Sequence, residues 1–252
     1  MPTPIDIAKE AADPAVAGLD LSCFDRNDLI NLILQRSEVM FDRPASGQVI
    51  RAWGRGNSAP MEAEIDRLGM AVARRAAGVI HAEYREIAPV LRALAPKRVA
   101  DIGCGYALFD LFLAQDQGCE LVLIDLESNE HRHFGFQAEG AAYSNLARAR
   151  QMLCANGVAD SRITTLNPRD VAPESKGPVD LVVSFLSCGF HYPVETYVPF
   201  LEQALAPDGA AIFDLRAARA APQIATLQKL GTVTELSASG NSTRVLLRKA
   251  AA

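Results

Sequence analysis

Strand-like and helix-like segments alternate along the second half of the chain, from Lys97 onward. Each strand-like segment is short and rich in valine, leucine and isoleucine, and a helical pattern follows most of them. Such alternation is typical of parallel βαβ units. The pattern therefore predicts a doubly wound α/β sheet with strands at residues 97–103, 119–126, 162–166, 178–186 and 209–215 and helices at residues 108–115, 143–155 and 196–205.

The end of the chain breaks this alternation. Residues 232–236 and 243–248 both have the pattern of strands, and the six residues between them leave no room for a helix. Two strands so close together form a hairpin, so the last strand is expected to run antiparallel to its neighbours. The sequence thus predicts a mostly parallel sheet that ends in an antiparallel hairpin.

The N-terminal part of the chain is different and is expected to be mostly helical. The first twenty residues contain three prolines and no amphipathic stripe, which predicts a loose arm. Asp25 is a suitable helix N-cap, and residues 42–60 are rich in turn formers. Apolar residues recur at helical spacing over 65–94, with a bend or a break expected near Pro89. We therefore expect two regions, an arm with a helical cap or substrate-side layer at 1–95 and a core at 96–252.

Charge and composition exclude several classes of protein. Thirty acidic and twenty-five basic residues give a net charge of -5, whereas proteins that bind nucleic acid by counterion release carry a basic excess. No apolar run reaches the roughly 18 residues of a membrane span, and the N-terminus lacks the apolar segment of a signal peptide. The five cysteines are odd in number and never spaced as CxxC. This favours reduced thiols in a cytoplasmic protein over disulfides or structural zinc.

The most informative motif follows the first strand-like segment, where Asp101 precedes Gly103 and Gly105. Glycines at this place let the backbone turn sharply into a helix and approach a ligand closely. A nicotinamide or flavin site of the GxGxxG type would need a third glycine at position 108, which is Leu108. An acid two residues before the first glycine suits a cationic ligand and suits a pyrophosphate badly. The motif therefore disfavours a nicotinamide-dependent oxidoreductase.

This segment resembles motif I of the class I S-adenosylmethionine-dependent methyltransferases, D/E-x-G-x-G-x-G, with Ala107 in place of the third glycine. The resemblance extends over residues 97–249, where the strand order and the hairpin fit the seven-stranded Rossmann-like methyltransferase fold. It implies S-adenosyl-L-methionine as cofactor and S-adenosyl-L-homocysteine as product. It also implies that Asp125 binds the ribose and that Asp170 accepts the adenine amino group. The implied cofactor-binding residues are Asp101, Gly103, Gly105, Asp125, Leu126, Asp170 and Phe185.

Two segments depart from the usual pattern of this family. Residues 127–142 are inserted after the second strand-like segment and either cover the site or form a solvated loop. The segment after the fourth strand-like segment carries His191, which we predict as the general base because histidine titrates near neutral pH. Arg216 fits a substrate contact and a helix-end salt bridge equally well. Histidines without a nearby pair of carboxylates do not indicate a metal site, so none is predicted. The predicted substrate-side residues are His131, His133, Tyr192 and Arg216.

The expected activity is methyl transfer from S-adenosylmethionine to an oxygen or nitrogen of a small molecule, for example a sugar or a secondary metabolite. No Asn-Pro-Pro-Tyr-like segment follows the fourth strand-like segment. Such a segment is common in the family's enzymes that methylate amino groups of nucleic acids and proteins, and nucleic acid is not an expected partner here. Two alternatives stay open: a protein methyltransferase, and a non-catalytic partner protein that binds S-adenosylmethionine. No membrane association is expected, and the oligomeric state is left open, a homodimer included.

Overall fold

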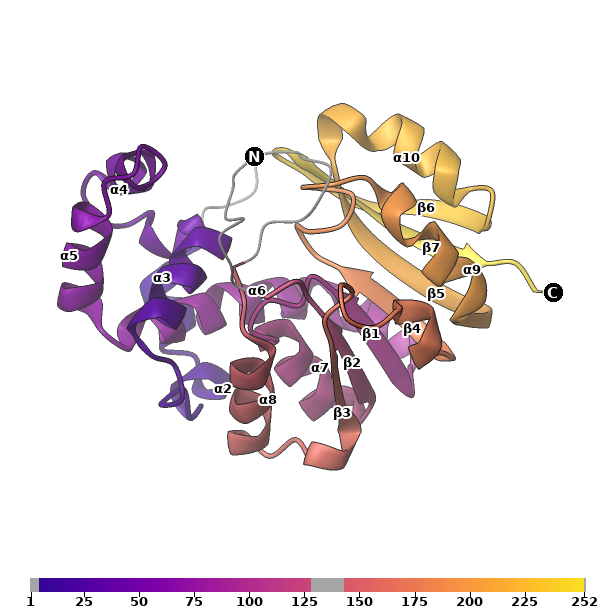
Figure 1. The fold of residues 1–252 in the computed structure, drawn as a ribbon, viewed down its shortest axis with the longest axis horizontal. Helices are drawn as coiled ribbons and strands as arrows, with labels where there is room; N and C mark the ends of the chain where they lie inside the picture. The colour runs from indigo at the N-terminus through magenta and orange to yellow at the C-terminus, as the bar shows by residue number, and fades with distance from the viewer. Residues whose placement is uncertain (1–4, 128–142, 252) are drawn as a thin grey trace.

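The computed structural model describes residues 5–127 and 143–251, whose strands form a seven-stranded sheet in the order β3-β2-β1-β4-β5-β7-β6 (Figure 1). Strands β1 to β5 run parallel, and β7 runs antiparallel to both β5 and β6. This arrangement confirms the predicted Rossmann-like methyltransferase fold with its C-terminal hairpin. The strands are β1 (Arg98–Ile102), β2 (Glu120–Ile124), β3 (Ile163–Leu166), β4 (Val179–Ser184), β5 (Leu205–Arg216), β6 (Gly231–Ser239) and β7 (Ser242–Lys249).

Alternate residues of the central strands pack into two apolar cores, one on each face of the sheet. In β1, Val99 belongs to one core, and Ala100 and Ile102 belong to the other. Leu121 and Val122 divide in the same way in β2. Because a parallel sheet is covered on both faces, its strands are almost continuously apolar, and this explains why they stand out in the sequence.

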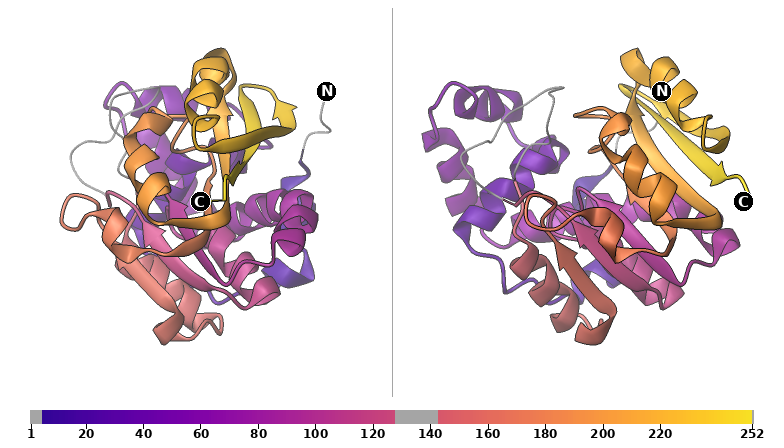
Figure 2. Two further views of the ribbon diagram at one scale, coloured as in Figure 1. Left: turned by 90° about the vertical axis from the view of Figure 1, so that its right-hand side faces the viewer. Right: turned by 45° about the vertical axis from the view of Figure 1, so that its right-hand side comes forward.

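The helices of the core divide between these two faces (Figure 2). One face packs against α7 (Leu108–Gln117) and α8 (Leu146–Ala155), and the opposite face packs against α9 (Val198–Gln203) and α10 (Ala220–Leu227). The N-terminal helices α3 (Arg26–Gln35), α5 (Ala59–Leu68) and α6 (Ala71–Leu94) share the apolar core of α7 and α8. Short 3-10 turns lie at Ser37–Met40, Asp160–Arg162, Pro173–Lys176, Val194–Tyr197 and Ala217–Arg219.

The start of the chain is not the loose arm that the sequence predicts. It forms two short helices, α1 (Ile7–Ala11) and α2 (Pro14–Ala17). The side chains of Asp6 and Asp13 accept backbone N–H groups at the starts of these helices, which satisfies donors that would otherwise be unpaired. Helix α1 packs closely on the longest helix at Gly78, where a Cβ atom would lie 2.7 Å from the backbone of Ala11. A glycine in the partner helix thus permits this docking.

The remaining N-terminal helices are α3 (Arg26–Gln35), α4 (Ser46–Trp53), α5 (Ala59–Leu68) and α6 (Ala71–Leu94). Asp25 caps α3, as predicted, and forms a capping box with Asp28. The predicted turn region contains α4 instead. Helix α6 is not broken at Pro89, which lies inside it. The helical segment is interrupted instead at Gly69, whose φ of 52° favours glycine.

Strand β6 forms one edge of the sheet and is mostly exposed. Its register with β7 shifts between Glu235 and Ser237, which marks a β-bulge. Within the described ranges, the helices are all too short or too polar to cross a bilayer.

Candidate functional site

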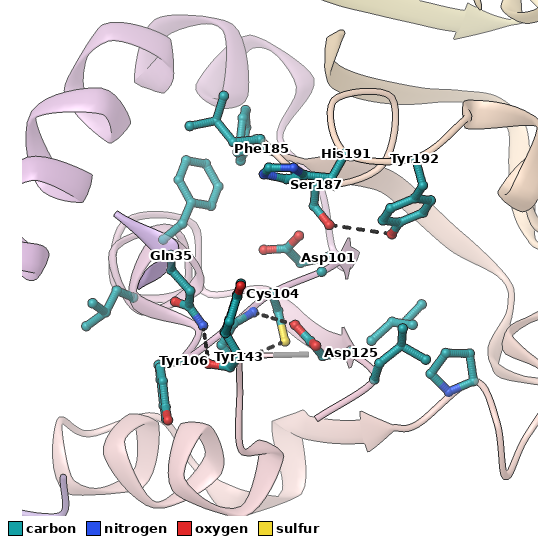
Figure 3. A pocket seen from close by; sticks show the side chains of 18 of the residues that line it. Gln35, Asp101, Cys104, Tyr106, Asp125, Tyr143, Phe185, Ser187, His191 and Tyr192 are labelled. Carbon is teal, nitrogen blue, oxygen red and sulfur yellow. Dashed lines mark hydrogen bonds between the residues drawn. The ribbon is translucent and has the colours of Figure 1, made fainter. Parts of the chain in front are cut away.

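A cavity of about 400 Å³ lies at the carboxyl ends of β1, β2 and β4 (Figure 3). This is the edge at which ligands bind in open α/β sheets. Loops that follow these strands form one wall, which we call the sheet wall. Residues of α3 and α6, with Arg36 directly after α3, form the opposite wall, which we call the helical wall. The cavity size falls within the range of about 300–1,000 Å³ that is usual for small-molecule sites.

The loop between β1 and α7 has an unusual backbone. Gly103, Gly105 and Ala107 all have positive φ angles, of 78°, 58° and 57°. A Cβ atom on Gly103 would lie 1.9 Å from the Ser187 side-chain oxygen, and one on Gly105 would lie 2.8 Å from Gln35 Oε1. Both positions therefore favour glycine, and at position 103 a side chain would also force Ser187 to move. Ala107, at the place of the third glycine of the motif it resembles, adopts the left-handed conformation, which costs free energy in a residue that has a Cβ atom.

Asp125 and Leu126 follow β2 and line the cavity. The Asp125 carboxylate accepts the backbone N–H of Gly105 at 2.8 Å and that of Glu127 at 3.4 Å. Burial raises the pKa of this carboxyl, although hydrogen bonds from the backbone N–H groups of Gly105 and Glu127 act in the opposite direction. The backbone of two adjoining loops thus holds the carboxylate in place.

Asp101 is the second acid of the sheet wall. It lies in β1, is only 4% exposed and lines the cavity. Burial and the neighbouring carboxyl of Asp110 raise its pKa well above the ordinary value. Cys104, between the two glycines, also lines the cavity, and burial and the surrounding carboxylates raise the pKa of its thiol. The thiol is therefore protonated at neutral pH and is not an activated nucleophile.

The segment after β4 supplies Phe185, His191 and Tyr192, all of which line the cavity. Figure 3 shows His191 and Ser187 above Asp101. The Tyr192 hydroxyl lies 3.4 Å from the Ser187 hydroxyl, and burial raises the pKa of Tyr192, which keeps its hydroxyl protonated. The backbone N–H of His191 donates to the carbonyl of Ser187 at 2.8 Å. The structure therefore brings together three of the predicted residues beside the glycine loop.

Two predicted site residues lie elsewhere. Arg216 ends β5 but does not line the cavity; its Nε donates to the carbonyl of Phe190 at 2.8 Å, and its guanidinium covers the Phe190 ring at 4.4 Å. It therefore supports the segment that carries His191. Asp170 is exposed outside the cavity, although Pro168 lines it, so its predicted adenine contact stays an untested prediction. His131 and His133 lie outside the described residues, together with most of the inserted segment.

The helical wall contains charged residues that the sequence analysis missed. Arg36 donates from Nε to Glu38 at 2.6 Å and from Nη1 to Glu83 at 2.9 Å, and Nη2 also pairs with Glu83. The Arg36 side chain is 10% exposed. Burial alone would lower its pKa, but Glu83 and Glu38 raise it, so the guanidinium stays charged. No local pattern signals this network, because its members come from separate elements and each one looks like an ordinary surface charge.

The cavity is strongly acidic. Glu83, Asp101, Asp125 and Glu174 line it, and among the described residues in its walls Arg36 is the only lysine or arginine. Because Glu83 and Glu38 already pair with Arg36, the charge that faces the remaining space is negative. Such a site attracts a cationic ligand and repels a phosphate.

The described residues that could bind a metal ion lie outside this cavity. In the ranges 5–127 and 143–251, Glu10, Asp13 and His81 form the group whose ligand atoms lie within 4.8 Å of one another. Both of these carboxylates pair with Arg85, and none of the three residues lines the cavity.

Comparisons with known proteins give only distant likenesses. No protein-family model matches the chain, and no curated protein matches it either. The chain is similar to the structure of the O-methyltransferase TomG from Streptomyces achromogenes, involved in tomaymycin synthesis and solved in complex with S-adenosylmethionine, at 14% identity and a TM-score of 0.49, with 66% of this chain and 79% of that chain covered. The chain is also similar to the structure of a candidate O-methyltransferase from Klebsiella pneumoniae, at 19% identity and a TM-score of 0.48. This match covers 68% of this chain and 80% of that chain.

A candidate O-methyltransferase from Nostoc punctiforme gives 16% identity and a TM-score of 0.45, with 69% of this chain covered. The match spans 59% of the Nostoc chain, which is less than two thirds of its length. Likenesses at these identities and scores assign no activity.

Proposed function

We propose that the chain is an S-adenosylmethionine-dependent methyltransferase that acts on an oxygen or nitrogen of a small molecule, such as a sugar or a secondary metabolite. One observation carries the proposal: in one cavity, Asp101 and Asp125 lie on either side of a tight loop whose positive φ angles favour glycine at positions 103 and 105. The fold adds support, because its strand order and reversed last strand are those of the class I methyltransferases.

The residues present fit this cofactor. When bound, S-adenosylmethionine supplies an electrophilic methyl group on a sulfonium centre. Asp101 would accept hydrogen bonds from its ammonium group. Asp125 would accept hydrogen bonds from the ribose hydroxyls, with the lone pairs that the backbone N–H groups leave unused. The side chains of Ser187 and Gln35 take the space that a Cβ atom would need at Gly103 and Gly105, so these glycines let the loop turn tightly beside the cavity. The carboxylates of the sheet wall thus match two features of the ligand, its positive charge and its hydroxyl donors.

A nicotinamide cofactor fits the same wall badly. Its pyrophosphate would lie beside the glycine loop, where Asp101 places a buried carboxyl group. Two like charges 4 Å apart near a protein surface repel each other by on the order of 4 kcal/mol. Leu108 also stands where the third glycine of that motif would be needed.

His191 is our candidate for the general base. An oxygen acceptor must lose its proton as it attacks, and an imidazole accepts protons effectively near neutral pH. His191 lines the cavity from the segment after β4, and the backbone bond to Ser187 and the support of Arg216 on Phe190 fix that segment. Much of the remaining rate enhancement in such transfers comes from alignment of the donor with the acceptor.

The helical wall is our candidate for the acceptor side, and residues 1–95 are proposed as a substrate-side layer over the core at 96–252. Ile80 and Glu83 of α6 and Leu34 of α3 line the cavity. A space of about 400 Å³ favours a small acceptor over a folded protein or a nucleic acid.

Two measurements in sequence test the proposal. Calorimetry with S-adenosylhomocysteine and with NAD as separate titrants should show binding of the first and none of the second. Release of S-adenosylhomocysteine from S-adenosylmethionine is then followed with a panel of small hydroxyl and amine acceptors, read by the mass shift of the methylated product. Binding of NAD alone would overturn the proposal. Cofactor binding without turnover on any acceptor would instead favour a non-catalytic S-adenosylmethionine-binding protein.

A further inference from the structure

A second carboxyl group lies directly behind Asp101. Asp110 stands in the first turn of α7 and is 0% exposed. Its carboxyl group is within hydrogen-bonding reach of Asp101, which lines the cavity on its other side. The two acids therefore form a buried pair, of which only Asp101 reaches the ligand space.

This pair lacks the partners that buried charges require. Asp101 Oδ1 and both carboxyl oxygens of Asp110 are buried and accept no hydrogen bond from a donor in the described part of the chain. Within the same residues, no lysine, arginine or histidine forms an ion pair with either acid. Two ionised carboxylates in contact without a cation repel each other strongly. In such pairs the pKa of one carboxyl is raised, so that the pair keeps one proton between its two members.

The surroundings reinforce this conclusion. Burial raises the pKa of Asp110 to about 7. The helix α6, packed on α7, contributes His81, whose pKa burial lowers, so it is neutral at neutral pH. Asp125, Cys104 and Cys119 are the titratable groups whose charges act on the pair, and none of them is positively charged at neutral pH. Arg75, Arg85 and Arg92 of α6 pair with other acids.

We propose that Asp101 and Asp110 share one proton, and that Asp110 takes this proton as a cationic group binds at Asp101. The inference rests on the function proposed above and names a further residue of the cofactor site. The proton moves from one carboxyl group to the other, so the pair keeps a net charge of about -1 before and after binding. Asp101 then faces the ligand as a carboxylate, and the Asp110 hydroxyl donates to its inner oxygen. Asp110 is thus a positioning residue, since it acts only through Asp101.

The pair also predicts how stability depends on pH. The native state retains a proton that the unfolded chain releases above about pH 4, because the folded pKa is raised above the ordinary value of 3.8. The contribution of the pair to stability is therefore greatest below pH 4 and is lost as the pH rises toward 7 and beyond. Replacing Asp110 by a neutral donor removes part of this loss.

Three variants test the proposal with S-adenosylhomocysteine as the probe at pH 7.5. Asp110→Asn keeps a hydrogen-bond donor toward Asp101 and should bind within about threefold of the wild type. Asp110→Ala removes the donor and should bind at least about tenfold more weakly, the cost of one charge-assisted hydrogen bond. Asp160→Asn, which removes an exposed acid paired with Arg150, controls for the lost charge and should match the wild type.

Rescue by asparagine and not by alanine supports the positioning role, whereas equal weakening in both variants, or none in either, overturns it. A second readout needs no ligand: the melting temperature should fall less between pH 5 and pH 8 in Asp110→Asn than in the wild type. An infrared band of a buried protonated carboxyl should also be present in the wild type at pH 7 and reduced in this variant. If the wild type binds no S-adenosylhomocysteine, the proposed function fails, and these two readouts still decide whether the proton is shared. Identical pH profiles would overturn the shared proton.

Discussion

The two walls of the cavity hold their polar groups by different means. On the sheet wall, backbone N–H groups of Gly105 and Glu127 fix Asp125, and the loop itself is shaped by positive φ angles. On the helical wall, side chains hold one another: Arg36 spans Glu83 and Glu38 with no backbone donor in the set. One wall is built by the path of the chain, and the other by charges from separate elements.

Because of this difference, we expect substitutions in the two walls to affect different properties of the protein, ligand affinity in one case and folding stability in the other. A change in the sheet wall alters what a ligand meets, since the backbone there is the binding surface. A change in the helical wall first exposes an uncompensated buried charge, so its main cost is to folding. We therefore expect variants of the sheet wall to lose affinity and variants of the helical wall to lose stability.

The largest effect is expected from His191, which lies on the sheet wall in the segment after β4 but is our candidate for proton removal and not for cofactor binding. His191→Ala should lower kcat on the true acceptor by roughly 10²–10⁴-fold with little change in cofactor affinity, because only proton removal is lost. Steady-state rates across pH check this, as the wild type should gain activity through one ionisation that the variant lacks. His191→Gln, which fills similar space without a basic nitrogen, should be as slow. A near-normal kcat in either variant would leave alignment alone as the mechanism.

On the sheet wall, Gly103→Ala should reduce cofactor affinity by at least about 100-fold, since the added methyl group collides with Ser187 and the segment after β4 must move. Gly118→Ala is a matched control: its φ of 66° is similar, but the space around it is open. Both variants should lose roughly 1–2 kcal/mol of stability from the left-handed backbone. Calorimetry with S-adenosylhomocysteine should then show a loss only for Gly103→Ala, and equal affinities would remove the loop from the site.

On the helical wall, Glu83→Ala should cost about 2–3 kcal/mol of unfolding free energy, because it leaves the buried Arg36 with Glu38 alone. Glu83 is partly exposed, so the figure lies below that for a fully buried pair. Glu86→Ala changes an exposed acid on the same helix and should be within about 0.5 kcal/mol of the wild type. Urea unfolding of both variants provides the measurement. Equal stabilities would show that the ion network contributes nothing, and the contrast between the walls would fail.

The smallest of these effects is expected from Asp125→Ala. Losing charge-assisted hydrogen bonds of about 1.5–3 kcal/mol each should weaken cofactor binding at least tenfold while the fold stays intact. Glu120→Ala, at the exposed opposite end of β2, should bind normally. Calorimetry gives the affinities and thermal unfolding checks the fold. Unchanged affinity in folded Asp125→Ala would rule out the ribose contact.

The sheet wall could be predicted from the sequence because its determinants are local. Asp101, Gly103 and Gly105 lie within five consecutive residues, and Asp125 ends the next strand. Strand ends at one edge of a parallel sheet meet by topology alone. Arg216 shows the limit of this reasoning: it ends β5 at that edge, but its side chain turns to Phe190.

The helical wall could not be predicted in this way. Arg36 and Glu83 are 47 residues apart, and nothing in either neighbourhood indicates a buried pair. Asp110 likewise has the sequence pattern of a helix-start acid, and only the packing of α7 against β1 reveals its neighbour. The two short N-terminal helices were missed because each has only a cap and a few residues, and their stability depends on docking to α6.

The β-bulge between Glu235 and Ser237 bears on how copies of the chain can associate. An exposed edge strand offers a row of unpaired backbone groups to any second strand, and this is a common route to edge-to-edge aggregation. The bulge interrupts that row and increases the local twist. Continuation of the sheet from one copy to another through β6 is therefore disfavoured, so a homodimer would need a different surface, and this edge is protected against fibril-like growth.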